Sequence, residues 1–545
     1  MFGKEVHRWI YTVSLACLAA SLPLSIFATS VFQVVLAANW ALEGRFRGKW
    51  EIFRQRKSLW LLLSIYLVFL GGLLYTSDFH YAFHDLRIKL PLAVLVIIMG
   101  TSDRIDKARL KWILLALVAG VFVGSMASLS VLVGIVDIPF SDMREISLFV
   151  SHIRFSLLIN VSIFSLIYMI FDREFSPRKW EPVIYTALMV WLVVFLFILQ
   201  TVTGILIFLA VSFIIFWIYL FRVWNIVLRW TLAVFMLAAL MLGMSLLTRS
   251  LGRFFKVDKV DREHIQQTTA NGRPYVNDFN DPFIENGHYI GLYLCEPELE
   301  KEWDRVSDID YHGKDAQGNE IKYTLIRYLT SLGLHKDSVG VSRLSRDDIR
   351  NIEQGKANYI YGKKWSLYAK VYEILWQLDV YRKGGNPSGH SVTQRILYLE
   401  GGLNIFREHP VLGVGTGDVK AAFDEYYKKT GSPLSPEWRL RAHNQYLTFL
   451  VTYGVIGFIW IFFALLYPVY LEHKARDYLF WVFMMIGLLS MLNEDTLETH
   501  IGVSFFVYFY CLFLLATPPK QDQAVRPEPG RHGKRFEPER AGIHP

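Results

Sequence analysis

The feature that most constrains this chain is a series of apolar runs, most of them about 18 residues long and nearly free of charged side chains. A helix of roughly that length crosses the ~30 Å hydrocarbon core of a bilayer. With 53% apolar and 19% charged residues, the chain is not an ordinary soluble enzyme, a disordered chain or a disulfide scaffold. The sequence predicts an all-α polytopic membrane protein with about 12 transmembrane helices. The predicted spans are 9–26, 28–42, 59–76, 89–101, 112–136, 155–171, 183–200, 204–221, 230–247, 445–471, 478–493 and 501–517.

Basic residues are distributed unevenly between alternate loops. One set of loops and both termini hold 25 Lys and Arg residues, whereas the opposite short loops hold 4. Because basic residues near span ends stay on the cytoplasmic side, both termini are expected inside and the one long loop outside. The net charge of +8 is therefore a signal of topology and does not indicate nucleic-acid binding.

The long loop, about residues 248–443, is the only part large enough to fold as a separate domain, and its 28 basic and 27 acidic residues nearly cancel. Within it, apolar residues at helical spacing predict a helix over 364–381, and alternation on either side of Gly318 predicts a hairpin. The predicted parts are an N-terminal membrane domain of about nine spans (1–247), the loop domain (248–443), a C-terminal membrane domain of about three spans (444–517) and a disordered cytoplasmic tail (518–545).

Several signals of soluble enzymes are absent from the sequence, which has no HExxH, paired CxxC or Walker A string. Two of its three cysteines, Cys17 and Cys511, lie inside apolar runs and Cys295 does not, so neither a disulfide framework nor a zinc site is expected. Asp308 and Asp310 have the Asp-x-Asp form that metal-dependent glycosyltransferases use. Such a motif is more often two solvated charges in a loop, and we predict no metal site.

Polar residues gather directly before the apolar run that begins at residue 445. Arg439, Arg441, His443 and Asn444 precede it. A neutral imidazole, which titrates near ~6.5, can accept a proton from a sugar hydroxyl. The alternative is an interfacial histidine whose neighbouring arginines reach toward lipid headgroups, and the spacing alone does not decide between the two.

Further candidate residues stand at other ends of the predicted spans. Arg395 can hold a phosphate with its planar fork or pair with a loop carboxylate. Glu494, Asp495 and Glu498 form an acidic turn between two apolar runs, where carboxylates are costly without a purpose, which favours a functional role. Arg154 begins an apolar run, and a lone arginine there is usually an anchor.

Three of these elements stand in an order that is typical of one family. Arg395 is followed by EHPVLGVGTGD, from Glu408 to Asp418, and then by HNQYLTFLVTYGVIG, from His443 to Gly457. This pattern resembles the signature of the O-antigen ligase family, integral membrane glycosyltransferases of the C type with about twelve spans and one large periplasmic loop. By itself, the glycine-rich segment is best explained as a tight external turn, because it lacks the GxGxxG spacing.

The resemblance implies an activity and a location. Such ligases take a glycan from undecaprenyl diphosphate on the periplasmic face of the bacterial inner membrane and join it to a hydroxyl of the lipid A core oligosaccharide. They work with inversion and without a metal or another cofactor. The implied partners are the lipid-linked donor, the lipid A core acceptor and membrane lipids, and no nucleic acid.

The resemblance also implies roles for residues. His443 would activate the acceptor hydroxyl, Arg395 would hold the diphosphate, and Asp495 or its neighbour Glu494 matches the acidic position of the late external turn. The predicted site contains these four residues and seven further substrate-binding residues: Arg439, Arg441, Asn444, Arg154, Gly413, Gly415 and Gly417.

One departure from the family pattern concerns the turn before the eighth predicted span. Many members carry a phosphate-binding arginine there, whereas Gln200 to Gly204 of this chain contain none. Arg154 or Arg144 would supply the missing charge, and we favour Arg154. Alternative activities are an O-antigen or exopolysaccharide polymerase, a protein O-oligosaccharyltransferase and, outside the enzymes, a transporter of the lipid-linked glycan.

Overall fold

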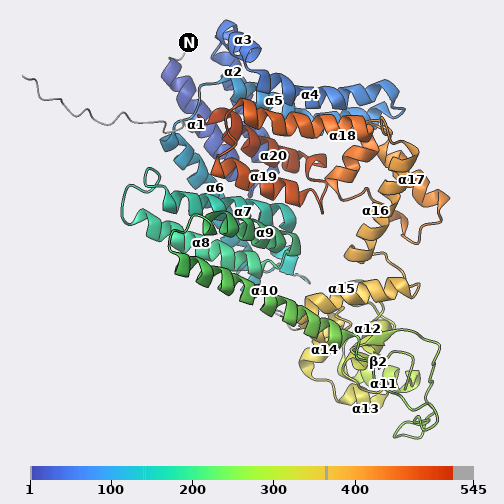
Figure 1. Ribbon diagram of the computed structural model, residues 1–545. Helices are drawn as coiled ribbons and strands as arrows, with labels where there is room; N and C mark the ends of the chain where they lie inside the picture. The colour runs from blue at the N-terminus through green and yellow to red at the C-terminus, as the bar shows by residue number, and fades with distance from the viewer. Residues whose placement is uncertain (1–2, 139, 141–142, 363–365, 520–545) are drawn as a thin grey trace, which may run out of the picture.

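The computed structural model describes residues 3–138, 140, 143–362 and 366–519 (Figure 1). The protein is mostly helical, with 68% helix and 2% strand, which confirms the predicted helical class. The predicted disordered tail, 518–545, lies outside the described residues from 520 onward.

Each predicted apolar run falls largely within one helix of a bundle. The run 445–471 coincides with its helix at both ends. The bundle helices are α1 (Lys4–Ser21), α2 (Ile26–Leu42), α4 (Lys57–Gly71), α5 (Phe79–Thr101), α6 (Lys107–Leu132), α7 (His152–Phe171), α8 (Glu181–Ile198), α9 (Val202–Leu220), α10 (Ile226–Phe254), α18 (Gln445–Leu471), α19 (Tyr478–Ser490) and α20 (His500–Cys511), with α3 (Phe46–Gln55) beside them. Short helical turns flank them: η1 (Gly72–Tyr75), η2 (Met143–Ile146), η5 (Thr496–Glu498) and η6 (Leu512–Ala516).

Fewer helices than predicted satisfy the length and composition of a membrane span. Among the described residues seven do so, or up to eight if α2 and α3, bent by 108°, are one broken span. The predicted number of twelve therefore stays a prediction. Helices α19 and α20 have only 13 and 12 residues, and α5 carries Asp85, Arg87 and Lys89 in its first half.

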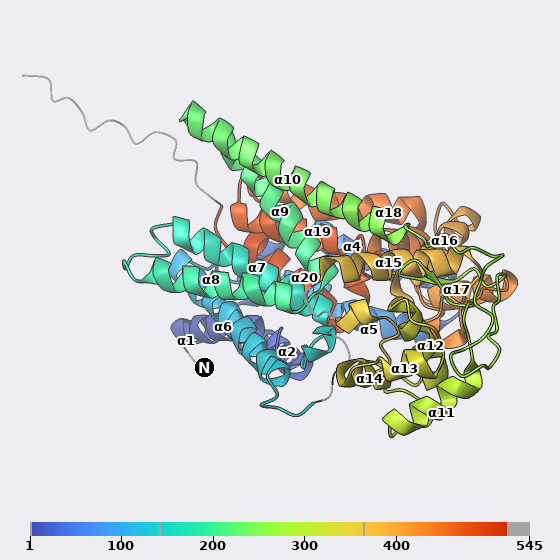
Figure 2. The same ribbon diagram turned by 90° about the horizontal axis from the view of Figure 1, so that it is seen from below.

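Helix α20 forms part of the centre of the bundle, and α10 lies at its edge (Figure 2). Every residue from Ile501 to Ala516 is buried, and aromatic rings of α20 pack against α19, as Phe483 does on Phe506. Helix α10 has no buried residue along its 29 positions. Its last turn contacts the loop domain, where the Phe254 ring lies 5.1 Å from that of Tyr372.

The loop between α10 and α18 contains a separate small core. Trp303, Tyr311 and Tyr328 are fully buried there. The elements around this core are β1 (Ile284–Glu285), β2 (His288–Tyr289), α11 (Glu296–Val306), α12 (Ile321–Ser331), α13 (Ser338–Ser342), α14 (Arg346–Glu353) and η3 (Tyr359–Gly362). Helix α15 (Leu367–Arg382) confirms the helix predicted over 364–381.

The predicted hairpin around Gly318 is confirmed only in part, as a single antiparallel bridge. Gly318 does form a tight turn with φ of 84°, and a single bridge pairs Lys314 with Glu320. From Ile321 onward, however, the chain is helix α12. Its buried apolar residues recur every fourth position, at Ile321, Leu325 and Leu329, which suits a helix and not a strand.

Two helices connect the loop domain to the bundle. Helix α16 (Ser391–Glu408) packs against α18, and α17 (Val419–Lys429) packs against α16 (Figure 1). The short turn η4 (Pro436–Trp438) follows. Apolar side chains of all three helices, among them Tyr398, Phe423 and Leu447, form one core.

At the end of the bundle where α18 stops, a buried carboxylate and its arginine partner connect the ends of four helices. Glu472 accepts hydrogen bonds of 2.7 Å from Nε and Nη2 of Arg56 and one of 3.0 Å from Arg104. The same Arg56 donates to the carbonyl oxygens of Gly100 in α5 and Leu515 beyond α20. One ion pair therefore connects the ends of α4, α5, α18 and α20.

We expect Glu472→Ala to lower the free energy of unfolding by about 3–5 kcal/mol, because Arg56 would stay buried without its partner. The measurement is the thermal midpoint of the purified protein in detergent. Glu51→Ala, which removes an exposed pair with Arg47, is the control and should change stability by less than about 1 kcal/mol. Equal midpoints for the two variants would contradict the assignment.

Candidate active site

Candidate residues from separate parts of the chain meet at the end of the bundle where α18 begins. We call this end of the bundle the site end. They come from α16, from the segment 439–444 before α18, and from the turn 493–499 between α19 and α20. The turn is held directly on α18: the amide of Asn444 donates to the carbonyl of Leu492 at 2.8 Å, and the backbone of Gln445 donates to Met491 at 2.9 Å.

His443 stands at the centre of this region with a strained backbone. Its φ is 47°, a left-handed value that is uncommon for a residue other than glycine and that is found at functional sites. The ring stacks on Tyr398 of α16, with 5.4 Å between centroids. Nδ1 of His443 is buried and has no hydrogen-bond partner among the described residues. The imidazole is therefore held by packing, and that nitrogen is not used in a structural hydrogen bond.

Asp495 contacts His443 through the backbone. One carboxylate oxygen accepts from the backbone N–H of His443 at 3.2 Å, and the other accepts from the hydroxyl of Thr448 at 2.7 Å. Burial raises the pKa of Asp495, while the Arg441 guanidinium acts to lower it. The carboxylate thus fixes the left-handed turn that positions His443.

A second acidic residue of this turn, Glu498, forms a buried ion cluster. It accepts from Nζ of Lys89 at 3.0 Å, from Arg441 at 3.0 Å and from the amide of Gln445 at 3.0 Å. Burial opposes its ionisation, but Lys89 and Arg441 together lower the pKa of Glu498 to about 2. A second carboxylate, Asp85, accepts from Lys89 at 2.7 Å. Arg441 is therefore engaged in a fixed pair.

Sequence reasoning missed Lys89 and Asp85. Both lie in α5 and are almost fully buried, at 2% and 5% exposure. A signal was present, because opposite charges four residues apart at the start of an apolar helix are costly without a purpose. Their partner Glu498 is 409 positions away, which no local pattern indicates.

Two predicted arginines lie around Glu494. Nη2 of Arg395 is 3.2 Å from its carboxylate, so the pairing with a loop carboxylate is realised here. Arg154, at the start of α7, also interacts electrostatically with Glu494 and donates to the hydroxyl of Ser151 at 3.2 Å. The structure therefore pairs Arg395 with Glu494 and places Arg154 within the electrostatic influence of the same carboxylate.

The turn that lacks an arginine lies beside the same place. The amide of Asn493 donates to the hydroxyl of Thr203, at the start of α9, at 2.9 Å. Asn493 directly precedes Glu494 in the chain. Arg154, which the charge of Glu494 affects, is thus near the turn Gln200 to Gly204 that contains no arginine.

Two other predicted residues make local contacts. Arg439 donates from Nε to the carbonyl oxygen of Leu434 at 3.0 Å, a contact within its own loop. Asn444 is the N-cap of α18, and its side chain accepts from the backbone N–H of Leu447 at 3.0 Å. The described contacts give both residues a structural task.

The glycine-rich turn packs against a break in α18. Backbone N–H groups of Val414 and Gly415 donate to the carbonyls of Val451 and Thr452 at 2.9 and 3.0 Å. These carbonyls lack helical partners because Gly454 has a φ of 61° and interrupts the helix. The N–H groups of the turn therefore donate to the free carbonyls of the broken helix and are not available to a ligand.

Close backbone approach explains the glycines of this turn. A Cβ on Gly413 would lie 2.4 Å from the carbonyl carbon of Thr452, and one on Gly417 would lie 2.1 Å from the carbonyl oxygen of Asp78. Gly417 also donates to the hydroxyl of Thr76 at 2.8 Å. The segment thereby joins α18 to the end of α4 and the start of α5.

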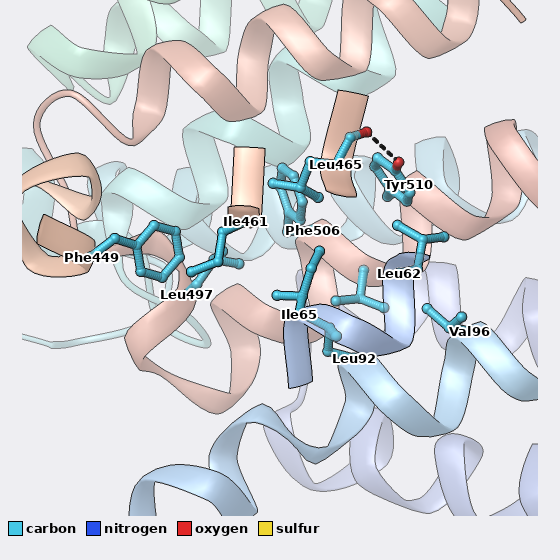
Figure 3. A pocket seen from close by; sticks show the side chains of 11 residues that line it. Leu62, Ile65, Leu92, Val96, Phe449, Ile461, Leu465, Leu497, Phe506 and Tyr510 are labelled. Carbon is cyan, nitrogen blue, oxygen red and sulfur yellow. Dashed lines mark hydrogen bonds between the residues drawn. The ribbon is translucent and has the colours of Figure 1, made fainter. Parts of the chain in front are cut away.

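A small cavity inside the bundle is apolar. Leu62, Leu92, Phe449 and Leu497 are among its lining residues, and its one phenol, Tyr510, donates to the carbonyl of Leu465 at 2.6 Å (Figure 3). No acid, base or cation lines it. The candidate chemistry lies at the site end and not in this cavity.

We expect Gly454→Ala to destabilise the protein by at least about 1–3 kcal/mol. The new methyl group would require a left-handed alanine and would lie 2.2 Å from the backbone of Val411. Gly243→Ala in α10, which meets no atom within 4 Å, is the control and should not lower the thermal midpoint. A neutral Gly454→Ala would show that the break in α18 is dispensable.

Residues 356–464 match the family model described as O-antigen ligase. The matched segment contains Arg395, the glycine-rich turn, His443 and most of α18, and it ends before the acidic turn. No curated protein matches the chain. The match confirms, over residues 356–464, the resemblance to the O-antigen ligase family predicted from the motifs.

Proposed function

We propose that the protein is an O-antigen ligase-type glycosyltransferase of the bacterial inner membrane. It transfers a glycan from undecaprenyl diphosphate to a hydroxyl of the lipid A core oligosaccharide on the periplasmic face. The family match over 356–464 and several membrane-span-like helices support this proposal at the level of a membrane glycan ligase or polymerase. The donor, the acceptor and the side of the membrane are part of the proposal.

The observation that carries the proposal is the state of His443. It combines a left-handed backbone, a buried Nδ1 without a described partner and a backbone bond to Asp495. Backbone strain of this kind persists when surrounding contacts hold it, and it is concentrated at functional sites. A neutral imidazole in this position is suited to take the proton of an acceptor hydroxyl.

The reaction can be written as one displacement. The acceptor oxygen forms a bond to the anomeric carbon of the donor sugar, and the bond from that carbon to the diphosphate oxygen breaks. His443 takes the hydroxyl proton, and undecaprenyl diphosphate leaves with the bonding electron pair. Attack opposite to the leaving group inverts the anomeric centre.

Arg395 and Arg154 are suited to the leaving group. Glu494 pairs with the guanidinium of Arg395 and acts on Arg154 electrostatically, so this carboxylate occupies Arg395 when no donor is bound. A diphosphate carries more negative charge than a carboxylate and would compete for this guanidinium. Fixed cations in a site of low polarity stabilise a charge that develops in the transition state.

The main alternative is a polymerase that extends the glycan on its lipid carrier, and accumulated intermediates separate the two. A strain without the ligase collects full-length glycan on the carrier. A strain without the polymerase collects single repeat units. Full-length chains in the deletion strain therefore support the ligase, and single units would replace it with the polymerase.

We expect His443→Ala to reduce glycan transfer by about 10²-fold or more, the contribution typical of general acid–base catalysis. Transfer is measured as glycan-capped lipopolysaccharide in the deletion strain that expresses the variant. Amounts in the membrane fraction and thermal midpoints should match those of the parent.

The chain offers a matched control at the opposite end of the same helix. His473 follows α18, is exposed and has a similar left-handed φ of 55°. His473→Ala should retain transfer. Retained transfer in His443→Ala would reject the role of His443 as the base. A loss of transfer in both variants would show that transfer depends on the integrity of the ends of α18 and not on the His443 imidazole.

Arg395→Lys should raise the KM for the lipid-linked donor by roughly 10-fold. A point charge does not replace a planar fork, and a lost charge-assisted hydrogen bond costs about 1.5–3 kcal/mol. Arg407→Lys, an exposed position on the same helix, is the control. An unchanged donor KM in Arg395→Lys would remove Arg395 from the donor site.

A further inference from the structure

Unpaired polar atoms gather beside His443. Twelve buried side-chain atoms of the described residues have no hydrogen-bond partner, and three of them belong to this region. They are Nδ1 of His390, Nε2 of Gln394 and Nδ1 of His443. A buried polar group without a partner costs about 1–3 kcal/mol, so each of these atoms calls for a partner that the described residues do not supply.

These atoms follow one face of α16. His390, Gln394 and Tyr398 are spaced by four residues, so their side chains lie on successive turns, about 6 Å apart along the axis. Tyr398 stacks on His443 at the inner end. At the outer end, the ring of His390 meets the partly exposed indole of Trp376 in α15, with 5.3 Å between centroids. We call His390, Gln394 and Tyr398 the polar row.

The polar row carries no free charge. Gln394, at 6% exposure, is a neutral amide. Burial lowers the pKa of His390, and the nearby Arg327 lowers it further, so its imidazole is neutral near pH 7 and can both donate and accept. Arg327 itself is paired with the fully buried Glu285 at 2.6 Å.

Neutral donors and acceptors beside aromatic rings fit a hydroxyl-rich ring and not a phosphate. A phosphate site needs cations, but Arg327, the arginine that acts on His390, is paired with the buried Glu285, and Arg395 is already assigned to the diphosphate of the donor. The hydroxyls of a sugar can accept from Gln394 and donate to His390, which satisfies both orphan atoms.

We propose that His390 and Gln394 form a saccharide subsite that binds sugar units next to the one that reacts at His443. The direction from Gln394 to His390 leads away from the reacting sugar along α16. This inference rests on the proposed function only for the identity of the reacting centre. The bound sugars belong to the acceptor core oligosaccharide or to the donor glycan, and the test separates these two sources.

The test measures binding apart from transfer. The full-length protein with His443→Ala is placed in lipid nanodiscs. Two probes are titrated separately by calorimetry: the core oligosaccharide released from lipid A, and the glycan chain released from its lipid carrier. Gln394→Leu, which keeps the approximate volume and removes the amide, and His390→Ala are compared with Glu400→Gln, an exposed position of the same helix.

We expect Gln394→Leu and His390→Ala each to weaken one of the two probes by about 5- to 10-fold, while Glu400→Gln leaves both unchanged. The probe that weakens identifies the source of the sugars. If Gln394→Leu has a lowered thermal midpoint, Gln394→Asn, which keeps the amide and shortens its reach, takes its place. Unchanged affinity for both probes in the Gln394 and His390 variants overturns the subsite.

Failure of the subsite and failure of the proposed function give different results. In an otherwise parental enzyme, Gln394→Leu should raise the KM for the same substrate and keep most of kcat. If His443→Ala still transfers glycan, the catalytic assignment falls, while the binding comparison still decides the subsite. If His443→Ala is inactive and the Gln394 and His390 variants bind both probes like the control, the proposed function is supported and the saccharide subsite is rejected.

Discussion

The site end depends on the buried carboxylate of Glu498. This one group joins α5 through Lys89, the segment before α18 through Arg441, and the first residue of α18 through Gln445. Such a cluster is costly to assemble in an apolar bundle, since each ion loses its hydration, and it persists because every partner is hydrogen-bonded. Removal of Glu498 would leave Arg441 without its ion-pair partner and Lys89 paired with Asp85 alone.

The acidic turn thus performs several tasks over a short stretch. Glu498 holds α5 and the start of α18 together. Asp495 holds the backbone of His443, and Glu494 pairs with Arg395. Only the last of the three faces the predicted diphosphate site. The charged groups around Glu498 are held in buried ion pairs. The pair of Arg395 with Glu494, whose side chains are 32% and 18% exposed, is more accessible.

Much of this arrangement could be predicted from local patterns, because the patterns are periodic or positional. The run 445–471 gave the bounds of α18, since an Asn N-cap precedes an uninterrupted apolar segment. The motif residues Arg395 and His443 meet at the site end as their order in the family suggests. The contact between Lys89 and Glu498 was not predictable, because the two residues are 409 positions apart.

Other differences between prediction and structure have equally local causes. The glycine-rich turn contains the residue types of an anion-binding loop, yet its N–H groups bond to α18 because Gly454 breaks that helix. The segment after Gly318 alternates over a few residues, but its burial follows a helical period from Ile321. In both cases a partner outside the local window decides the outcome.

Helix α10 has a consequence for how the loop domain is held over the site. Since none of its residues is buried, side-chain packing against the bundle does little to fix its tilt. Phe254 at its end contacts Tyr372 of α15, the helix that carries Trp376 beside the polar row. This ring contact therefore couples the position of α15, and with it the outer end of the polar row, to the end of α10.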